Sequence, residues 1–165
     1  MIKILRTIRF DESDRRVFEH AAEAGEWACS GAFAFAELDG DLHGKTRQAF
    51  ANGFLGLGSF GRSTFATVSE ATAEEREEIE LALAGHVVGV YGAPSIAAAL
   101  LAVREEIDFV EDLCRDVPIN TVFTVRRARD ETGAITEEFR RISPPAGAPL
   151  HARAWTIERE VGDGA

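Results

Sequence analysis

Two consecutive helical segments over residues 73–117 constrain the fold of this chain more than any other feature of its sequence. Thr72 precedes Glu75 at the spacing of a capping box, which predicts the start of a helix. Gly92 and Pro94 predict a stop and a new start. Apolar residues then recur at spacings of three and four; they are Ile96, Leu100, Val103, Ile107, Val110 and Cys114. We therefore expect a helical hairpin with one apolar face.

Strand patterns flank this hairpin on both sides. Residues 2–38 predict an alternating strand over 2–10, a weaker strand over 15–22 and a longer strand over 26–38. The longer strand has large side chains on one face and small ones on the other, which is typical of a central strand. Residues 62–69 predict a further strand, and residues 119–161 predict C-terminal strands with a hairpin connection over 130–133.

One further helix is predicted over residues 42–57, with Asp41 as its N-cap and Phe50, Phe54 and Leu57 at helical spacing. The order of elements predicts an α+β fold: a largely antiparallel sheet with the helical hairpin and this further helix packed on one face. A length of 165 residues is suited to a single domain over residues 1–165.

Residues 56–63, GLGSFGRS, contain the spacing G-x-G-x-x-G. A dinucleotide-binding turn needs this motif between a strand and a helix, whereas here it follows a predicted helix and precedes a predicted strand. A kinase glycine-rich loop lies between two strands, and no V-A-I-K, H-R-D or D-F-G motif accompanies it. We therefore expect these glycines to end the helix and form the turn.

Residues 40–46, GDLHGKT, stand between a predicted strand and a predicted helix but have one residue too few for a phosphate-binding P-loop. They are better explained as the capped start of a helix. An alternative is plain anion binding by the free N–H groups of the helix start, with Lys45 and Arg47 nearby.

No metal, cofactor or catalytic set is indicated. Cys29 and Cys114 form no C-x-x-C pair and are expected to be buried thiols, and the four histidines show no zinc-binding spacing. A partial calcium-loop pattern begins at Asp39, but Phe50 occupies the position that requires glutamate. Since no nucleophile motif such as G-x-S-x-G is present, the sequence favours a non-enzymatic protein.

The net charge of −10 argues against nucleic acid as a partner. Residues 70–117 hold twelve acidic and three basic residues, a net charge of −9, so most of the negative charge falls on the hairpin. The amino-terminal MIKILRTIRF is too short and too charged for a signal peptide or a membrane span. We expect a cytoplasmic protein that does not contact a membrane.

Three stretches, ILRTIRF, GEWACSGAFAF and GKTRQAFANGFLGLGSFGRSTF, resemble a small family of uncharacterised bacterial proteins, a domain of unknown function. The resemblance covers most of the chain. It implies no catalytic or cofactor residues.

Two hypotheses for function follow. The first is a non-enzymatic cytoplasmic accessory or interaction protein, a homodimer, which contacts itself or a protein partner through acidic helical residues; these are Glu74, Glu77, Glu78, Glu105, Asp108, Glu111 and Asp112. The alternative is a binder of, or enzyme for, a small anionic ligand at the Gly44–Arg62 junction. There Lys45, Arg47 and Arg62 would hold the anion, and Trp27 or Phe60 would line the pocket.

Overall fold

The computed structural model describes residues 1–36, 42–143 and 156–161, with the backbone alone for 143 and 156–161. The strands are β1 (Ile2–Ile8), β2 (Trp27–Cys29), β3 (Phe54–Gly56), β4 (Arg62–Ser63), β5 (Phe65–Ala71), β6 (Val122–Arg129), β7 (Ile135–Ser143) and β8 (Thr156–Val161). The helices are α1 (Ser13–Val17), the 3-10 helix η1 (Ala32–Phe35), α2 (Gly44–Asn52), α3 (Ala73–Tyr91) and α4 (Ile96–Cys114).

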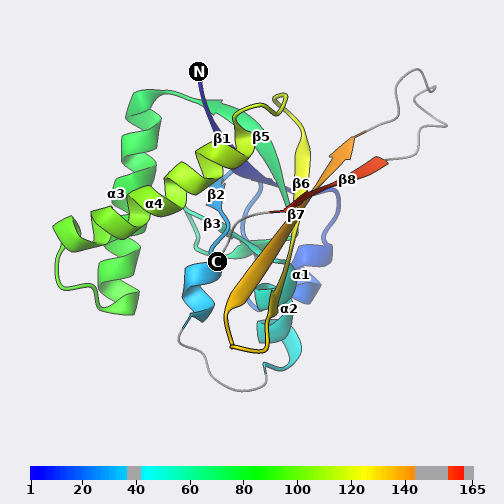
Figure 1. The fold of residues 1–165 in the computed structure, drawn as a ribbon, viewed down its shortest axis with the longest axis horizontal. Coiled ribbons are helices and arrows are strands. Elements are labelled where there is room, and N and C mark those ends of the chain that lie inside the picture. The colour runs from blue at the N-terminus through cyan, green and yellow to red at the C-terminus, as the bar shows by residue number, and fades with distance from the viewer. Residues whose placement is uncertain (37–41, 144–155, 162–165) are drawn as a thin grey trace.

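The strands of the described residues form one eight-stranded sheet in the order β4-β3-β2-β1-β5-β6-β7-β8 (Figure 1). Every neighbouring pair in it is antiparallel. The connection between β6 and β7 is the predicted hairpin, in which Gly133 adopts a positive φ of 87°. The α+β fold with an antiparallel sheet is therefore confirmed. Of the C-terminal strands predicted over 119–161, residues 144–155 lie outside the described residues.

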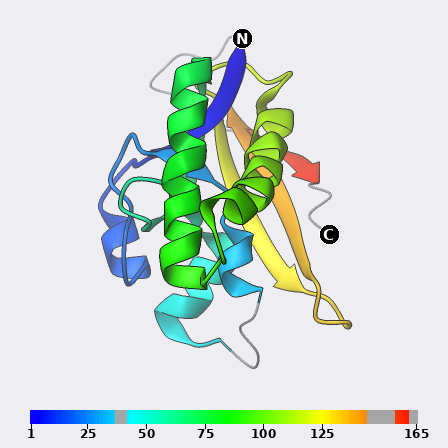
Figure 2. The same cartoon turned by 90° about the vertical axis from the view of Figure 1, so that its left-hand side faces the viewer.

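The helical hairpin is formed by α3 and α4, which lie together over one face of the sheet (Figure 2). The predicted capping box is present, because Glu75 N–H donates to Thr72 Oγ1 at 3.1 Å and Thr72 N–H donates to Glu75 Oε1 at 3.0 Å. Gly92, in the left-handed conformation at φ 72°, ends α3. The Ser95 side chain accepts a hydrogen bond from Ala98 N–H and starts α4.

The apolar stripe of α4 forms the centre of the core. Val103, Ile107, Val110 and Cys114 are all buried, whereas Ile96, the first residue of the predicted stripe, is 45% exposed. Aromatic rings continue the core into the sheet through Phe54, Phe109 and Phe139. Leu100 is half-buried and packs against the core, so the periodicity predicts the fully buried face of α4 correctly from Val103 onward.

The strand predicted over residues 26–38 is wrong for most of its described length. β2 ends at Cys29, and the chain turns at Gly31, where φ is 76°, into the 3-10 helix η1. A Cβ at Gly31 would lie 2.6 Å from both Leu55 Cβ and Arg62 Nη1, so both the backbone conformation and the close packing require glycine. Arg62 lies 31 positions later in the chain, so a local sequence pattern cannot reveal this contact.

Two other predicted elements are corrected. The weaker strand predicted over 15–22 is wrong: residues 13–17 form the short helix α1, because the Asp11 carboxylate accepts the Ser13 N–H and starts a turn, and of residues 18–22 only Ala21 makes an isolated bridge, to Arg62. The helix predicted over 42–57 spans Gly44–Asn52 and is followed directly by β3. His43, rather than Asp41, occupies its N-cap position, and Asp41 lies outside the described residues.

Candidate anion-binding site

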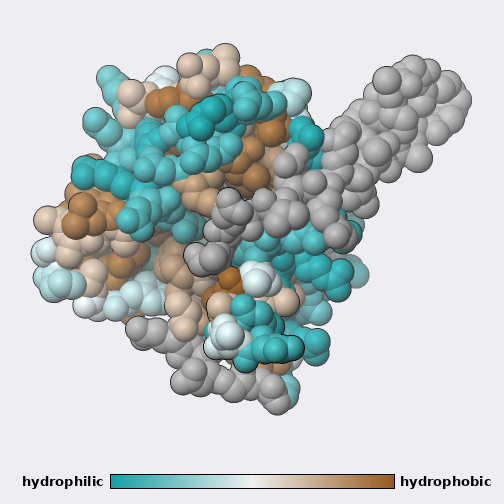
Figure 3. Space-filling model, viewed as in Figure 1, coloured by the Kyte–Doolittle hydropathy of each residue, from teal (hydrophilic) through white to brown (hydrophobic). Residues whose placement is uncertain are grey.

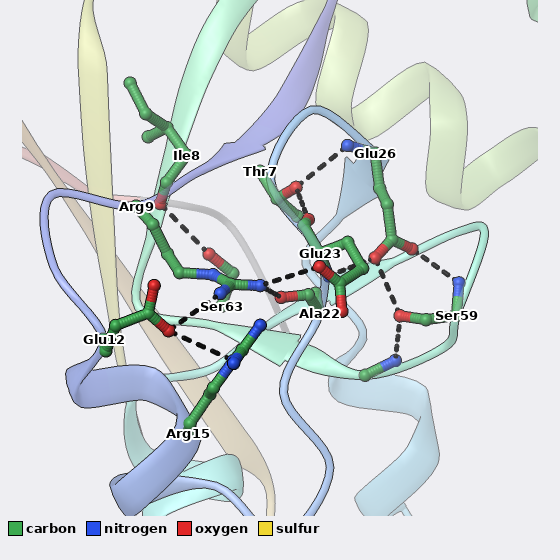
Figure 4. Close-up of polar contacts among 11 residues, drawn as sticks. Thr7, Ile8, Arg9, Glu12, Arg15, Ala22, Glu23, Glu26, Ser59 and Ser63 are labelled. Atoms are coloured by element: carbon green, nitrogen blue, oxygen red, sulfur yellow. Dashed lines mark hydrogen bonds and ion pairs between the residues drawn. The ribbon is translucent and has the colours of Figure 1, made fainter.

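The glycine-rich segment forms a hairpin turn between β3 and β4, not the end of a helix as its sequence predicted. The Glu26 carboxylate lies in this turn (Figure 4). Glu26 Oε1 accepts the N–H groups of Gly58 at 2.8 Å and Ser59 at 2.6 Å, and Oε2 accepts Ser59 Oγ at 2.7 Å. A turn that presents adjacent N–H groups is an anion-binding arrangement, and here the protein's own carboxylate fills it.

The pKa of Glu26 reflects this contact. Its partial burial acts to raise the pKa, but the hydrogen bonds from Ser59 and Gly58 outweigh that effect and leave the pKa below its usual value. Gly61, at the end of the turn, packs so closely that a Cβ would lie 2.6 Å from the Ala21 backbone. The glycines therefore serve the turn and its packing, and the N–H groups of Gly58, Ser59 and Gly61 are engaged within the chain.

Arg62 follows the turn and carries its side chain into the protein, where the residue is only 8% exposed. Its guanidinium donates to the carbonyls of Gly53 at 3.3 Å and Gly31 at 3.2 Å, and lies 4.7 Å from the centre of the Phe35 ring. No carboxylate of the described residues comes within ion-pair distance of it. Burial, together with the charge of Arg127, lowers the pKa of Arg62 to about 10.

Arg127, the neighbouring buried arginine, is fully partnered. Its Nε donates to Glu137 Oε2 at 3.0 Å, and its Nη1 donates to the carbonyls of Phe50 at 2.9 Å and Gly53 at 2.8 Å. Those carbonyls belong to the end of α2, where backbone acceptors lack helical partners and a cation is favourable. Ser30 completes the cluster through its carbonyl and its hydroxyl, which contact Arg127 and Glu137.

Sequence reasoning missed this ion cluster, although a signal exists. Arg127 shares one face of β6 with Phe123 and Val125, both of which are buried. A charged residue on an apolar strand face indicates a buried partner, and the register places Glu137 directly opposite.

A cavity of about 270 Å³, here called the junction pocket, opens beside Arg62. It is lined by Phe18, Glu19, His20, Ala34, Phe35, Lys45, Thr46, Ala49, Phe60, Arg62 and Tyr91. The pocket thus joins the start of α2, the β3–β4 turn, η1 and the end of α3. Lys45 is exposed and makes no ion pair with the described residues.

Three of the five predicted ligand-binding residues, Lys45, Phe60 and Arg62, meet in the junction pocket. Arg47 does not line it, because two residues along a helix turn the side chain through about 200°. Trp27 lines a different cavity, beside α3, and its ring lies 3.7 Å below the Arg6 guanidinium. No sequence pattern indicates the pocket's other aromatic residues, which come from distant elements.

Phe60 is held in an unusual backbone conformation, with φ 59°. Its ring stacks on the His86 ring, with centroids 3.8 Å apart and planes 3° apart, and His86 in turn meets Tyr91 edge to face. Burial and the nearby charge of Arg62 lower the pKa of His86, which favours the neutral imidazole. His20 fixes the other side of the turn through a 3.0 Å hydrogen bond with the Ser59 carbonyl.

The predicted acidic surface on α3 and α4 divides into two groups. Asp108 and Glu111 bind Arg76, and Asp112 lies 2.5 Å from Arg115. The remaining four predicted acids make no ion pair or hydrogen bond with the described residues; they are Glu74, Glu77, Glu78 and Glu105.

Other features of the described residues add no second site of comparable character. A larger cavity of about 520 Å³ is lined by Asp11 and Glu138 as well as by Arg126 and Arg140, so acids accompany its cations. Within the described ranges, no three His, Cys, Asp or Glu side chains gather where they could hold a metal ion. No single helix there is long and apolar enough to cross a membrane, although α3 and α4, bent by 118° at their connection, pass that test as a pair.

The fold and the pocket define an α+β protein with an antiparallel sheet, a helical hairpin over one face, and a cavity with cationic and aromatic walls. The chain matches the model of a family described as "Family of unknown function (DUF6505)" over residues 1–156, and it belongs to that family. No curated protein and no solved structure matches it.

Proposed function

We propose that this protein binds a small anionic ligand in the junction pocket. The observation that carries the proposal is Arg62, a buried arginine that lines a cavity and has no carboxylate partner among the described residues. Buried charges in proteins are normally paired, because an uncompensated charge is costly to remove from water. Arg127 obeys this rule through Glu137, and an anion in the pocket would satisfy it for Arg62.

The surroundings of Arg62 support an anion in this position. Lys45 adds a second positive charge to the pocket lining, against a single acid, Glu19. The Glu106 carboxylate acts on the Arg62 guanidinium only through space, and its own pKa is raised by its burial. Because Glu106 also accepts the Gly31 N–H, its charge is only partly directed at Arg62.

The test compares two exposed cationic residues of α2, Lys45 and Arg47. Lys45→Gln removes a cation that lines the pocket, whereas Arg47→Gln removes one that does not. A panel of inorganic phosphate, acetate and succinate is titrated by thermal shift and calorimetry at low ionic strength. At least one anion should raise the melting temperature of the wild-type protein by mass action, and Lys45→Gln should weaken its binding several-fold while Arg47→Gln does not. The absence of any stabilisation at millimolar anion, or an equal effect of both variants, would overturn the proposal.

A second candidate is the non-enzymatic cytoplasmic interaction protein, acting as a homodimer or with a protein partner. It is favoured by the four hairpin acids that make no ion pair with the described residues and by exposed apolar residues near them, such as Leu81 at 57% and Leu101 at 69%. Figure 3 shows hydrophobic atoms over the α3–α4 connection next to hydrophilic atoms along α4. Light scattering at high micromolar concentration tests self-association, which Leu101→Ser should weaken. A monomer at all concentrations, with no partner on affinity purification, would remove this candidate.

A further inference from the structure

We infer that the anion of the junction pocket is a single-ring aromatic carboxylate. This inference rests on the proposed function and names the class of ligand at that site. Besides its two cations, the pocket is walled by the rings of Phe18, Phe35, Phe60 and Tyr91. Aromatic walls favour another flat ring, because rings attract one another in offset-stacked and edge-to-face arrangements.

The position of the Arg62 charge relative to these rings narrows the class of ligand that the pocket can bind. The Arg62 guanidinium carbon lies 4.7 Å from the centre of the Phe35 ring, so cation and aromatic surface are immediate neighbours. An anion held by Arg62 must therefore carry any ring close to its charge. A carboxylate attached directly to a ring satisfies this condition, whereas a long chain between ring and carboxylate does not.

The size of the pocket sets the number of rings. A cavity of roughly 150 Å³ accommodates benzene. The junction pocket, at about 270 Å³, has room for one ring with its carboxylate and a small substituent. A dinucleotide would not fit within it, since pockets for larger ligands extend to roughly 1,000 Å³.

Phe60 supports the idea that the aromatic wall is built for a ligand. A bulky residue rarely adopts a positive φ, and such strained positions cluster at functional sites. Here the conformation turns the Phe60 ring onto His86, which covers one ring face by stacking. Because Phe60 also lines the pocket, its remaining surface is available to a ligand.

Four probes distinguish the contribution of the ligand's negative charge to binding from that of its aromatic ring. They are benzoate, cyclohexanecarboxylate, benzamide and inorganic phosphate, each titrated by calorimetry into the full chain. Benzoate should bind at least tenfold more tightly than cyclohexanecarboxylate, which keeps the charge and loses the π system. The affinity for benzoate should also be at least tenfold higher than that for benzamide, which keeps the ring and loses the charge. If phosphate or cyclohexanecarboxylate binds as well as benzoate, the aromatic class is wrong while the anion site stands. If none of the anions binds, both proposals fall.

Two variants, each of which replaces a residue of positive φ by glycine, complete the test. Phe60→Gly removes the ring and leaves a residue that tolerates φ 59°, so the turn can keep its shape. Asn120→Gly makes the same kind of change at the other described non-glycine residue with positive φ, at 73°, outside the pocket. Phe60→Gly should reduce the preference for benzoate over cyclohexanecarboxylate several-fold, and Asn120→Gly should leave it unchanged. A Phe60→Gly protein with native circular dichroism and unchanged benzoate preference would refute the inference.

Discussion

Replacement of Glu26 by glutamine tests whether the glycine-rich turn depends on an internal anion. The carboxylate accepts hydrogen bonds from Gly58, from Ser59 and from the Glu23 N–H, the last at 2.5 Å. Glutamine keeps one oxygen for the two turn N–H groups but places an NH₂ group against the Glu23 N–H, which is itself a donor. The variant therefore loses the negative charge and leaves one N–H without its acceptor.

The magnitude follows from these contacts. A hydrogen bond to a charged group contributes about 1.5–3 kcal/mol, and an unsatisfied donor costs about 1–3 kcal/mol when buried. Because Glu26 is half-buried, solvent screens part of both effects, and we expect the free energy of unfolding to fall by about 2 kcal/mol at pH 7. Glu23→Gln is the matched control. The Glu23 side chain is 71% exposed and its ion pair with Arg9 spans 3.4 Å, so this change should alter the stability by about 0.5 kcal/mol or less.

The loss should also depend on pH. The pKa of Glu26 is lowered in the folded protein, so the stabilisation by its charge is fully present above the pKa of an unfolded carboxyl, about 4.3. It disappears as the pH falls through the lower folded-state pKa. Urea unfolding of the wild-type protein and both variants between pH 7 and pH 3 measures this, and the gap between wild type and Glu26→Gln should narrow with acid. A gap below about 0.5 kcal/mol at pH 7, or one that is independent of pH, would refute the reasoning.

Three further predictions concern the rest of the fold. Arg127→Met leaves the Glu137 carboxylate buried without its cation and should lower the free energy of unfolding by about 3–5 kcal/mol. A double variant that also carries Glu137→Leu should recover part of this loss, as measured by urea unfolding. A double variant that recovers no stability would argue against the ion pair. Thr72→Ala should cost about 1 kcal/mol through the lost cap of α3, measured in the same way, with Thr72→Ser as a milder control. Burial raises the pKa of Cys29 well above its usual value and that of Cys114 to about 12. Both thiols should therefore react slowly with a disulfide reagent in the folded protein at pH 8 and rapidly in urea. Fast reaction of the folded protein would contradict this prediction.

The parts of the fold that sequence predicts are those specified by neighbouring residues. The capping box of Thr72 and the stop at Gly92 act within one turn of helix, and their pattern fixes the hairpin over residues 73–114. The strand predicted over 26–38 fails because Gly31 is fitted against Arg62, and the helix predicted over 42–57 is too long because residues 54–56 pair with β2 and β4 instead. Contacts between distant segments outweigh local periodicity at both places.

The residues of the junction pocket also divide into those that the local sequence could predict and those that it could not. Lys45, Phe60 and Arg62 could be proposed together because they flank one short stretch of the sequence. Tyr91 and His20 could not, since they reach the junction pocket from the end of α3 and from the segment after α1, and no sequence spacing relates those elements.

The contrast between the two buried arginines is the strongest argument that this fold has a ligand. Both guanidiniums donate to the Gly53 carbonyl, at 3.3 Å from Arg62 and 2.8 Å from Arg127, so two positive charges lie close together in the interior. Their repulsion contributes to the low pKa of Arg62, yet among the described residues a carboxylate, that of Glu137, pairs with Arg127 and none pairs with Arg62. An apolar residue at position 62 would avoid this repulsion, since replacing buried ionic groups by hydrophobic ones is often neutral or stabilising. A bound anion would convert the charge of Arg62 from a source of instability into the determinant of binding.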